Sequence, residues 1–199
     1  MIVAVARSDP GRRCLSALAG LAFAGLTGCA QLPLGEPAAS FNNIEKAGRS
    51  GTAPVAVGPF RLDPDAAPGI NAGLSVRSNV VVSPIQGSFA QYLRQTLITD
   101  LQAAGLYDPA SPSEISGFLT DSTLDVPLDT GHASLGARFV VVRLGKAVYD
   151  KELKVSASWP SSFVGMEAIP SGVNQYGALY HTLVGKLLDD PDYQAANPK

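Results

Sequence analysis

Cysteine is nearly absent from this chain, and the positions of the two that occur limit the chemistry of the rest. Cys14 and Cys29 both lie within the first 29 of the 199 residues. Residues 30–199 therefore form no disulfide and contain neither a thiol nucleophile nor a thiolate metal ligand. The fold must depend on an apolar core, which a domain of about 140 residues can build by burying roughly two thirds of its unfolded surface.

Charged residues are few, and the basic ones are outnumbered. The chain has 15 Lys and Arg against 17 Asp and Glu, and residues 1–28 hold three Arg and one Asp. Without that segment the balance is 12 against 16, a net charge of −4, which argues against a nucleic-acid partner because phosphate binding needs a basic surface. Glycine-rich phosphate-binding motifs are missing too, so we expect no nucleotide and no cofactor.

Histidine is also scarce, which restricts the options for catalysis. Asp129 and His132 lie in a turn that enters a strand, and with a serine they would form a hydrolase- or transferase-type triad. No GxSxG motif accompanies them, and no third metal ligand is nearby. His181, the other histidine, is expected on the polar flank of a helix. We therefore expect no metal site and no enzymatic activity, and a hydrolase or transferase that uses this triad is the least favoured alternative.

Residues 1–28 have the three parts of a secretory signal peptide. Three arginines precede position 14, residues 14–23 carry no charge, and small residues lead to Gly28 and Cys29. This order is typical of export followed by cleavage. Glycines interrupt the apolar run, so it predicts a signal peptide rather than a membrane-spanning helix.

Leu26-Thr27-Gly28-Cys29 resembles the lipobox of bacterial lipoproteins. The resemblance implies cleavage between Gly28 and Cys29 and fatty acyl chains, palmitate among them, on Cys29. Each buried methylene contributes about 0.8 kcal/mol, so two or three chains anchor a protein durably in a membrane. Ala30 rather than Asp follows the cysteine, which by resemblance implies the periplasmic face of the outer membrane of a Gram-negative bacterium. Ordinary secretion with a cut near Cys29 is the alternative.

Composition divides the remaining chain into three parts. Residues 29–53, rich in proline and glycine and poor in large apolar groups, are predicted to be the lipidated N-terminus and a flexible tether, because such a stretch buries too little surface to offset its ordering entropy. Residues 54–190 are predicted to form the globular domain, and residues 191–199 a tail.

The domain shows alternating strand and helix patterns. Two register arguments are specific: the strand at 113–126 changes phase near Asp121, which predicts a bulge there, and the apolar faces of the last hairpin coincide only if 141 pairs with 149 and 137 with 153. Gly105 is expected to end the first helix. The predicted strands are 54–60, 76–83, 113–126, 133–144 and 147–159, and the predicted helices are 85–104 and 174–188.

This order indicates an α+β fold, a two-layer sandwich in which two helices cover one face of a mainly antiparallel sheet of about five strands. With the lipobox and the tether, it resembles small envelope lipoproteins, namely the auxiliary lipoproteins of ABC-type transporters and domains similar to the TolB amino-terminal fold. The resemblance implies a non-enzymatic partner of an envelope machine and supplies no functional residues. It is carried by Ser88-Phe89-Ala90-Gln91-Tyr92-Leu93, by Ala103-Ala104-Gly105-Leu106 and by the helix before Asp189-Asp190.

The connection over residues 160–172 has unusual apolar content for a loop rich in Ser, Gly and Pro. Trp159, Phe163, Met166 and Ile169 are candidates for a surface that contacts a partner or lipid, and the alternative is that they fold back to close the core. The sequence thus predicts a lipid-anchored periplasmic accessory protein that binds an envelope protein in a transport or assembly machine. The alternative function is a binder of a lipid or glycan in a cleft between sheet and helices.

Overall fold

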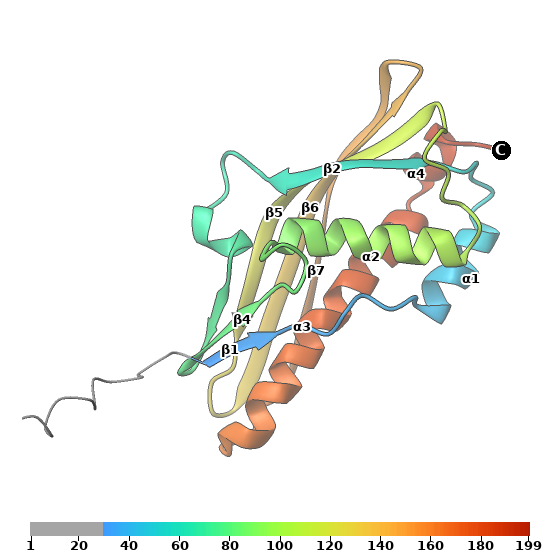
Figure 1. Ribbon diagram of the computed structural model, residues 1–199. Coiled ribbons are helices and arrows are strands. Elements are labelled where there is room, and N and C mark those ends of the chain that lie inside the picture. The colour runs from blue at the N-terminus through green and yellow to red at the C-terminus, as the bar shows by residue number, and fades with distance from the viewer. Residues whose placement is uncertain (1–29) are drawn as a thin grey trace, which may run out of the picture.

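The structure is a computed structural model that describes residues 30–199 (Figure 1). Within these residues two mixed sheets and four α-helices form an α+β fold. The larger sheet has the order β2-β5-β6-β7. Its strands are β2 (Ala56–Leu62), β5 (Ser113–Asp125), β6 (Thr130–Arg143) and β7 (Lys146–Pro160).

A smaller sheet has the order β1-β4-β3 and consists of β1 (Ala30–Pro33), β3 (Leu74–Val76) and β4 (Asn79–Val82). The α+β class is confirmed, but the prediction of one mainly antiparallel sheet of five strands is wrong in detail. The strands are divided between two sheets, and β1 with β4 and β2 with β5 pair in parallel.

The helices are α1 (Phe41–Arg49), α2 (Phe89–Ala103), α3 (Gly165–Leu188) and α4 (Pro191–Ala196), with a short 3-10 turn at Pro68–Asn71. The two long helices, α2 and α3, lie across the same face of the large sheet (Figure 1). Their apolar stripes meet the alternating inward residues of β5 and β6, which is the arrangement that buries both apolar surfaces.

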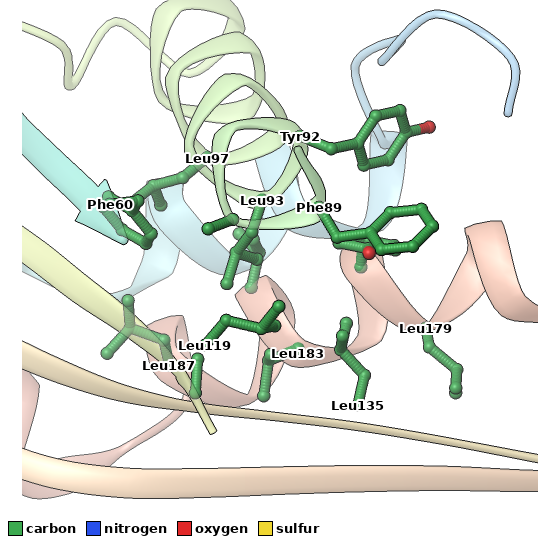
Figure 2. Close-up of a cluster of buried hydrophobic side chains, with 14 of the residues drawn as sticks. Phe60, Phe89, Tyr92, Leu93, Leu97, Leu119, Leu135, Leu179, Leu183 and Leu187 are labelled. Carbon is green, nitrogen blue, oxygen red and sulfur yellow. The ribbon is translucent and has the colours of Figure 1, made fainter. Parts of the chain in front are cut away.

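The core between helices and sheet is closely packed with side chains from both layers. Leu93 and Leu97 of α2 face Leu119 of β5 and Leu183 of α3 (Figure 2), and all four are fully buried. Edge-to-face aromatic pairs continue the same packing between α2 and α3, with ring centroids 5.5 Å apart for Phe89 and Tyr176 and 4.7 Å apart for Tyr92 and Tyr180.

Both register predictions are confirmed. The β5–β6 pairing shifts between Leu119 and Asp121, where the apolar pattern changes phase. In the β6–β7 hairpin Val141 pairs with Tyr149, and a second bulge follows at Val142. Each bulge brings an apolar face back toward the core, since a slip of one residue would turn that face to solvent.

The first helix begins later than predicted. Gln86 and Gly87 have positive φ angles of 53° and 61°, so the chain turns before α2 starts. Ser88 is the N-cap of α2, and its side chain accepts a hydrogen bond from the Gln91 backbone N–H. The predicted glycine end is confirmed, because Gly105 follows α2 with a φ of 70° in the left-handed region that glycine adopts without steric cost.

The predicted strand at residues 76–83 is a hairpin. β3 ends at Val76 and β4 begins at Asn79, with Arg77 in the turn at a φ of 52°. The hairpin contacts the core through only a few positions, such as Val76 and Val81.

The prediction of a flexible tether over residues 30–53 is wrong for the part that the structure describes. Residues 30–33 form β1, and α1 packs on α2 and α3. Leu34 and Ala47 are buried, so this segment contributes to the core. Composition alone missed this because the segment's partners, β4 and the long helices, lie elsewhere in the sequence.

The connection at 160–172 and the tail at 191–199 are also more ordered than predicted. Helix α3 begins at Gly165 and includes Pro170, a residue that removes one backbone donor and usually ends a helix. At the C-terminus, α4 buries Tyr193, and Asn197 Nδ2 donates to the carbonyl of Ala53 at 2.8 Å.

Candidate functional site

The predicted cleavage and acylation site, Gly28 and Cys29, lies outside the described residues. The structure does show the position of the next residue, Ala30. Ala30 is the first residue of β1 and pairs with Asn79 of β4. Asn79 directly follows the β3–β4 turn formed by Arg77 and Ser78. The residue after Cys29 therefore lies beside this turn.

Arg77 connects the β3–β4 turn to two other loops. Its guanidinium donates from Nε to the Val126 carbonyl at 3.1 Å and from Nη2 to the Pro127 carbonyl at 3.2 Å. It also donates from Nη2 to Ser162 O at 2.9 Å and from Nη1 to Phe163 O at 3.3 Å. One cation thus binds four backbone carbonyls from the β5–β6 turn and the β7–α3 connection.

Exposed apolar side chains are concentrated at this same end. Phe163 is 78% exposed and Met166 is 89% exposed, and neither fills a gap in the core. We call Leu128, Phe163, Val164 and Met166 the apolar tip; these are four of the seven large apolar residues that are exposed within residues 30–199. Clustering of this kind marks an interaction surface more often than isolated exposure does.

The structure separates the four residues predicted as partner contacts. Phe163 and Met166 are exposed in the apolar tip, whereas Trp159 is only 7% exposed and Ile169 packs against the core. The indole of Trp159 lies against Gly131, where an added Cβ would approach its Cε2 to 2.4 Å. Trp159 is thus a core residue. For this side chain the alternative prediction holds, namely that the apolar residues near the connection fold back to close the core.

The candidate catalytic residues Asp129 and His132 are exposed at the start of β6. The imidazole that does face a carboxylate is His181, whose Nδ1 lies 3.4 Å from Oδ2 of Asp100. Asp100 is fully buried on α2 and was missed because it lies beside the apolar stripe of an amphipathic helix. Residues 30–199 contain no cluster of His, Cys, Asp and Glu suited to a metal ion.

The space between sheet and helices, where a ligand cleft was the alternative prediction, is occupied by protein side chains. Tyr176 lies there with its hydroxyl 2.7 Å from both Ser122 Oγ and the Tyr180 hydroxyl. Burial raises the pKa of Tyr176 and Tyr180 well above the ordinary value, so both phenols stay protonated and act as members of a hydrogen-bonded core.

Across residues 30–199 we find no helix with the length and apolarity needed to span a bilayer. The fold and the apolar tip define a small α+β domain whose chain enters beside an exposed apolar surface. No family model and no curated protein matches the chain.

Among solved structures, a protein of family DUF330 from Xanthomonas campestris is similar to this chain, with a TM-score of 0.53 and 12% identity over 80% of this chain and 95% of that one. This likeness concerns the fold. Two weaker similarities are lipoprotein GNA1162 from Neisseria meningitidis (TM-score 0.29, 14% identity, 69% and 99% of the two chains) and a PelC dodecamer from Paraburkholderia phytofirmans (TM-score 0.38, 12% identity, 83% and 96%).

Proposed function

We propose that this protein is a lipoprotein of the bacterial envelope, held by acyl chains on Cys29 at the periplasmic face of the outer membrane, and that it acts by binding a protein of a transport or assembly machine. The observation that carries the proposal is the junction of lipobox and fold. Leu26-Thr27-Gly28-Cys29 ends where β1 begins at Ala30, so cleavage before Cys29 would leave the folded domain directly on its anchor.

Binding of a protein is supported by the face of the large sheet opposite the helices. In β6 the inward residues from Gly131 to Val141 are buried, and the outward ones other than Gly136 are exposed or half-buried, Arg138 among them. Four residues lie in register across this face, one on each of the four neighbouring strands: Arg61, Phe118, Arg138 and Glu152. A half-buried aromatic ring flanked by arginines is typical of protein-binding surfaces, in which aromatic residues and Arg are enriched.

Binding of a lipid or glycan between sheet and helices is the second candidate, and the packing makes it the weaker one. Leu93, Leu119 and Leu135 occupy that interface and are fully buried (Figure 2). A ligand would have to displace this packed core, which costs several kcal/mol for each large side chain that loses its contacts.

The anchor is tested by expressing the full chain in a Gram-negative host with radiolabelled palmitate. We expect the parent chain to take up label and to sediment with outer-membrane fractions, and Cys29→Ala to lose both properties. Cys14→Ala is the matched control, because it removes the other cysteine and should keep the label. An unlabelled parent chain would overturn the lipoprotein proposal.

The binding role is tested with a photo-crosslinking amino acid at Phe118, and at exposed Phe41 as control. We expect one specific protein adduct from position 118 in intact cells, and its loss when Arg138→Glu reverses the neighbouring charge. Absence of any adduct at 118, or the same adducts at both positions, would contradict a partner on this face of the sheet.

A further inference from the structure

We infer that the apolar tip inserts into the surface of the membrane that holds the Cys29 acyl chains, and so fixes the orientation of the domain on the bilayer. This inference rests on the acyl anchor proposed above. It assigns the tip residues Leu128, Phe163, Val164 and Met166 a lipid bilayer as their binding partner.

The first support is the position of the anchor. The chain outside the structure ends at Cys29, and neighbouring Cα atoms are about 3.8 Å apart, so the acylated residue is attached directly to the first residue of β1. Ala30 pairs with Asn79 beside the β3–β4 turn, and Arg77 in that turn bonds to Phe163 O of the tip. Figure 1 shows the start of β1, the β5–β6 turn and the start of α3 at one end of the molecule.

The second support is the chemistry of the tip. Its side chains are 50% to 89% exposed although they are apolar, and they leave water when they enter the acyl region of a bilayer. The acyl chains proposed on Cys29 hold the protein at the membrane, and the tip adds apolar area that can be buried in the same surface. Because the anchor keeps the tip beside the bilayer, insertion is an intramolecular step with a high effective concentration.

The third support is the hydrogen bonding of the loop backbone. A loop that enters a bilayer loses the water that would bind its carbonyl groups, and each unpaired group then carries a penalty. At this end the carbonyls of Val126, Pro127, Ser162 and Phe163 all accept hydrogen bonds from Arg77. Four carbonyls of the loops that carry the tip are thus already paired, whereas exposed loops in water have no such requirement.

The test uses the acylated protein after cleavage before Cys29, in which Cys14 is removed, Cys29 is blocked and residues 30–199 contain no thiol. Met166→Cys is labelled with an environment-sensitive NBD dye and reconstituted into phosphatidylcholine vesicles. The control is Leu144→Cys, because Leu144 is 82% exposed and lies in the β6–β7 turn, at the opposite end of β6 from the tip (Figure 1).

We expect the dye at position 166 to shift its emission to the blue, to gain intensity several-fold, and to be quenched by nitroxide-labelled lipid, while the dye at 144 keeps its emission in water. Phe163→Cys is a second labelling site with the same expected result. Equal emission at 166 and 144 in vesicles overturns membrane insertion. So does a blue shift at 166 that requires added envelope protein, because a protein would then cover the tip.

Mass spectrometry and vesicle flotation separate this inference from the proposed function. If the chain carries acyl groups and floats with the vesicles while the dye at 166 remains in water, the anchor stands and tip insertion is wrong. If the chain carries no acyl groups and stays at the bottom of the gradient, the lipoprotein proposal fails, and the inference fails with it.

Discussion

The side-chain amide of Asn43 donates a 2.7 Å hydrogen bond to Oδ2 of Asp100, and both residues are buried although 57 positions separate them. The Ser40 backbone N–H donates to Oδ1 of the same carboxylate at 2.7 Å, and the Asn43 amide also donates to the His181 carbonyl at 2.9 Å. One carboxylate thus joins α1 to α2 and lies beside α3. This network makes residues 40–43 part of the folded domain.

Asp100→Ala is expected to lower the free energy of unfolding by about 3 kcal/mol, because it removes charge-assisted hydrogen bonds and leaves the buried Asn43 amide with one donor unpaired. Urea unfolding followed by circular dichroism measures the change. The matched control is Asp189→Ala, which breaks an exposed ion pair with Lys46 and should cost less than about 1 kcal/mol. Equal losses in the two variants would contradict the structural role of Asp100.

Trp159 and Phe163, four residues apart, should respond oppositely to truncation. Trp159→Ala is expected to cost about 3–5 kcal/mol, since it empties a core position. Phe163→Ser changes a side chain that is 78% exposed and should shift the free energy of unfolding by less than about 0.5 kcal/mol. Thermal unfolding of both variants makes the comparison, and a large loss for Phe163→Ser would place that ring in the core instead of the tip.

Gly131 and Gly48 form a pair of glycine-to-alanine tests. A Cβ at Gly131 would lie 2.4 Å from Trp159 Cε2, so Gly131→Ala is expected to destabilise the protein by about 1–3 kcal/mol through overpacking. Gly48 is exposed within α1, and an added Cβ would have no heavy atom within 4 Å, so Gly48→Ala should stabilise by about 0.5–1 kcal/mol. Chemical denaturation gives both values, and changes of the same sign would refute this account.

The protein should unfold at alkaline pH because of its buried tyrosines. Burial raises the pKa of Tyr176, Tyr180 and Tyr193 above the ordinary value in the folded state. Below pH of about 10 these phenols are protonated in both states and stability is complete. As the pH rises above about 10, the unfolded state releases protons that the folded state keeps, so stability falls.

Phenolate absorbance and circular dichroism followed together test this prediction. We expect ionisation of these tyrosines to occur with the loss of the folded signal, in one steep transition. Gradual ionisation near pH of about 10 with the folded signal unchanged would show that the three phenols reach solvent in the native state.

Local patterns predicted the register of the large sheet. The alternation of apolar residues along β6 and β7 required an offset that brings Val141 opposite Tyr149, and the bulge supplies it. The phase change in β5 predicted the irregularity before Asp121 for the same reason. Both follow from the two-residue period of a strand, which depends on neighbouring residues alone.

The errors arose where distant residues decide the local structure. Residues 30–49 have a composition that favours disorder, but they gain buried contacts and hydrogen bonds from β4, α2 and Asp100, which composition cannot show. Pro170 normally ends a helix, and the turns on both sides of it continue as α3. Propensity is a weak prior that tertiary contacts override.

The candidate site was predictable in part. Large apolar residues in a polar connection indicated Phe163 and Met166, and both are exposed. Arg77 was predicted to lie in the middle of a strand, whereas it lies in a turn. No local pattern indicated that it would donate hydrogen bonds to the loops that carry Phe163 and Met166. Nor did any pattern indicate Leu128, which is adjacent only in space. This surface forms where the β3–β4 turn, the β5–β6 turn and the β7–α3 connection lie together, and only the tertiary fold brings these three loops into contact.

The length of β6 sets how far the domain can extend from its support. From Thr130 to Arg143 the strand contains 14 residues, which at about 3.3 Å per residue corresponds to roughly 45 Å. If the acyl chains and the apolar tip hold the opposite end at the membrane as proposed, the hairpin at Leu144 lies at most about that far from the bilayer surface. A protein rooted in another layer of the envelope would have to approach within this distance to make contact, so the spacing between layers becomes a condition for complex formation.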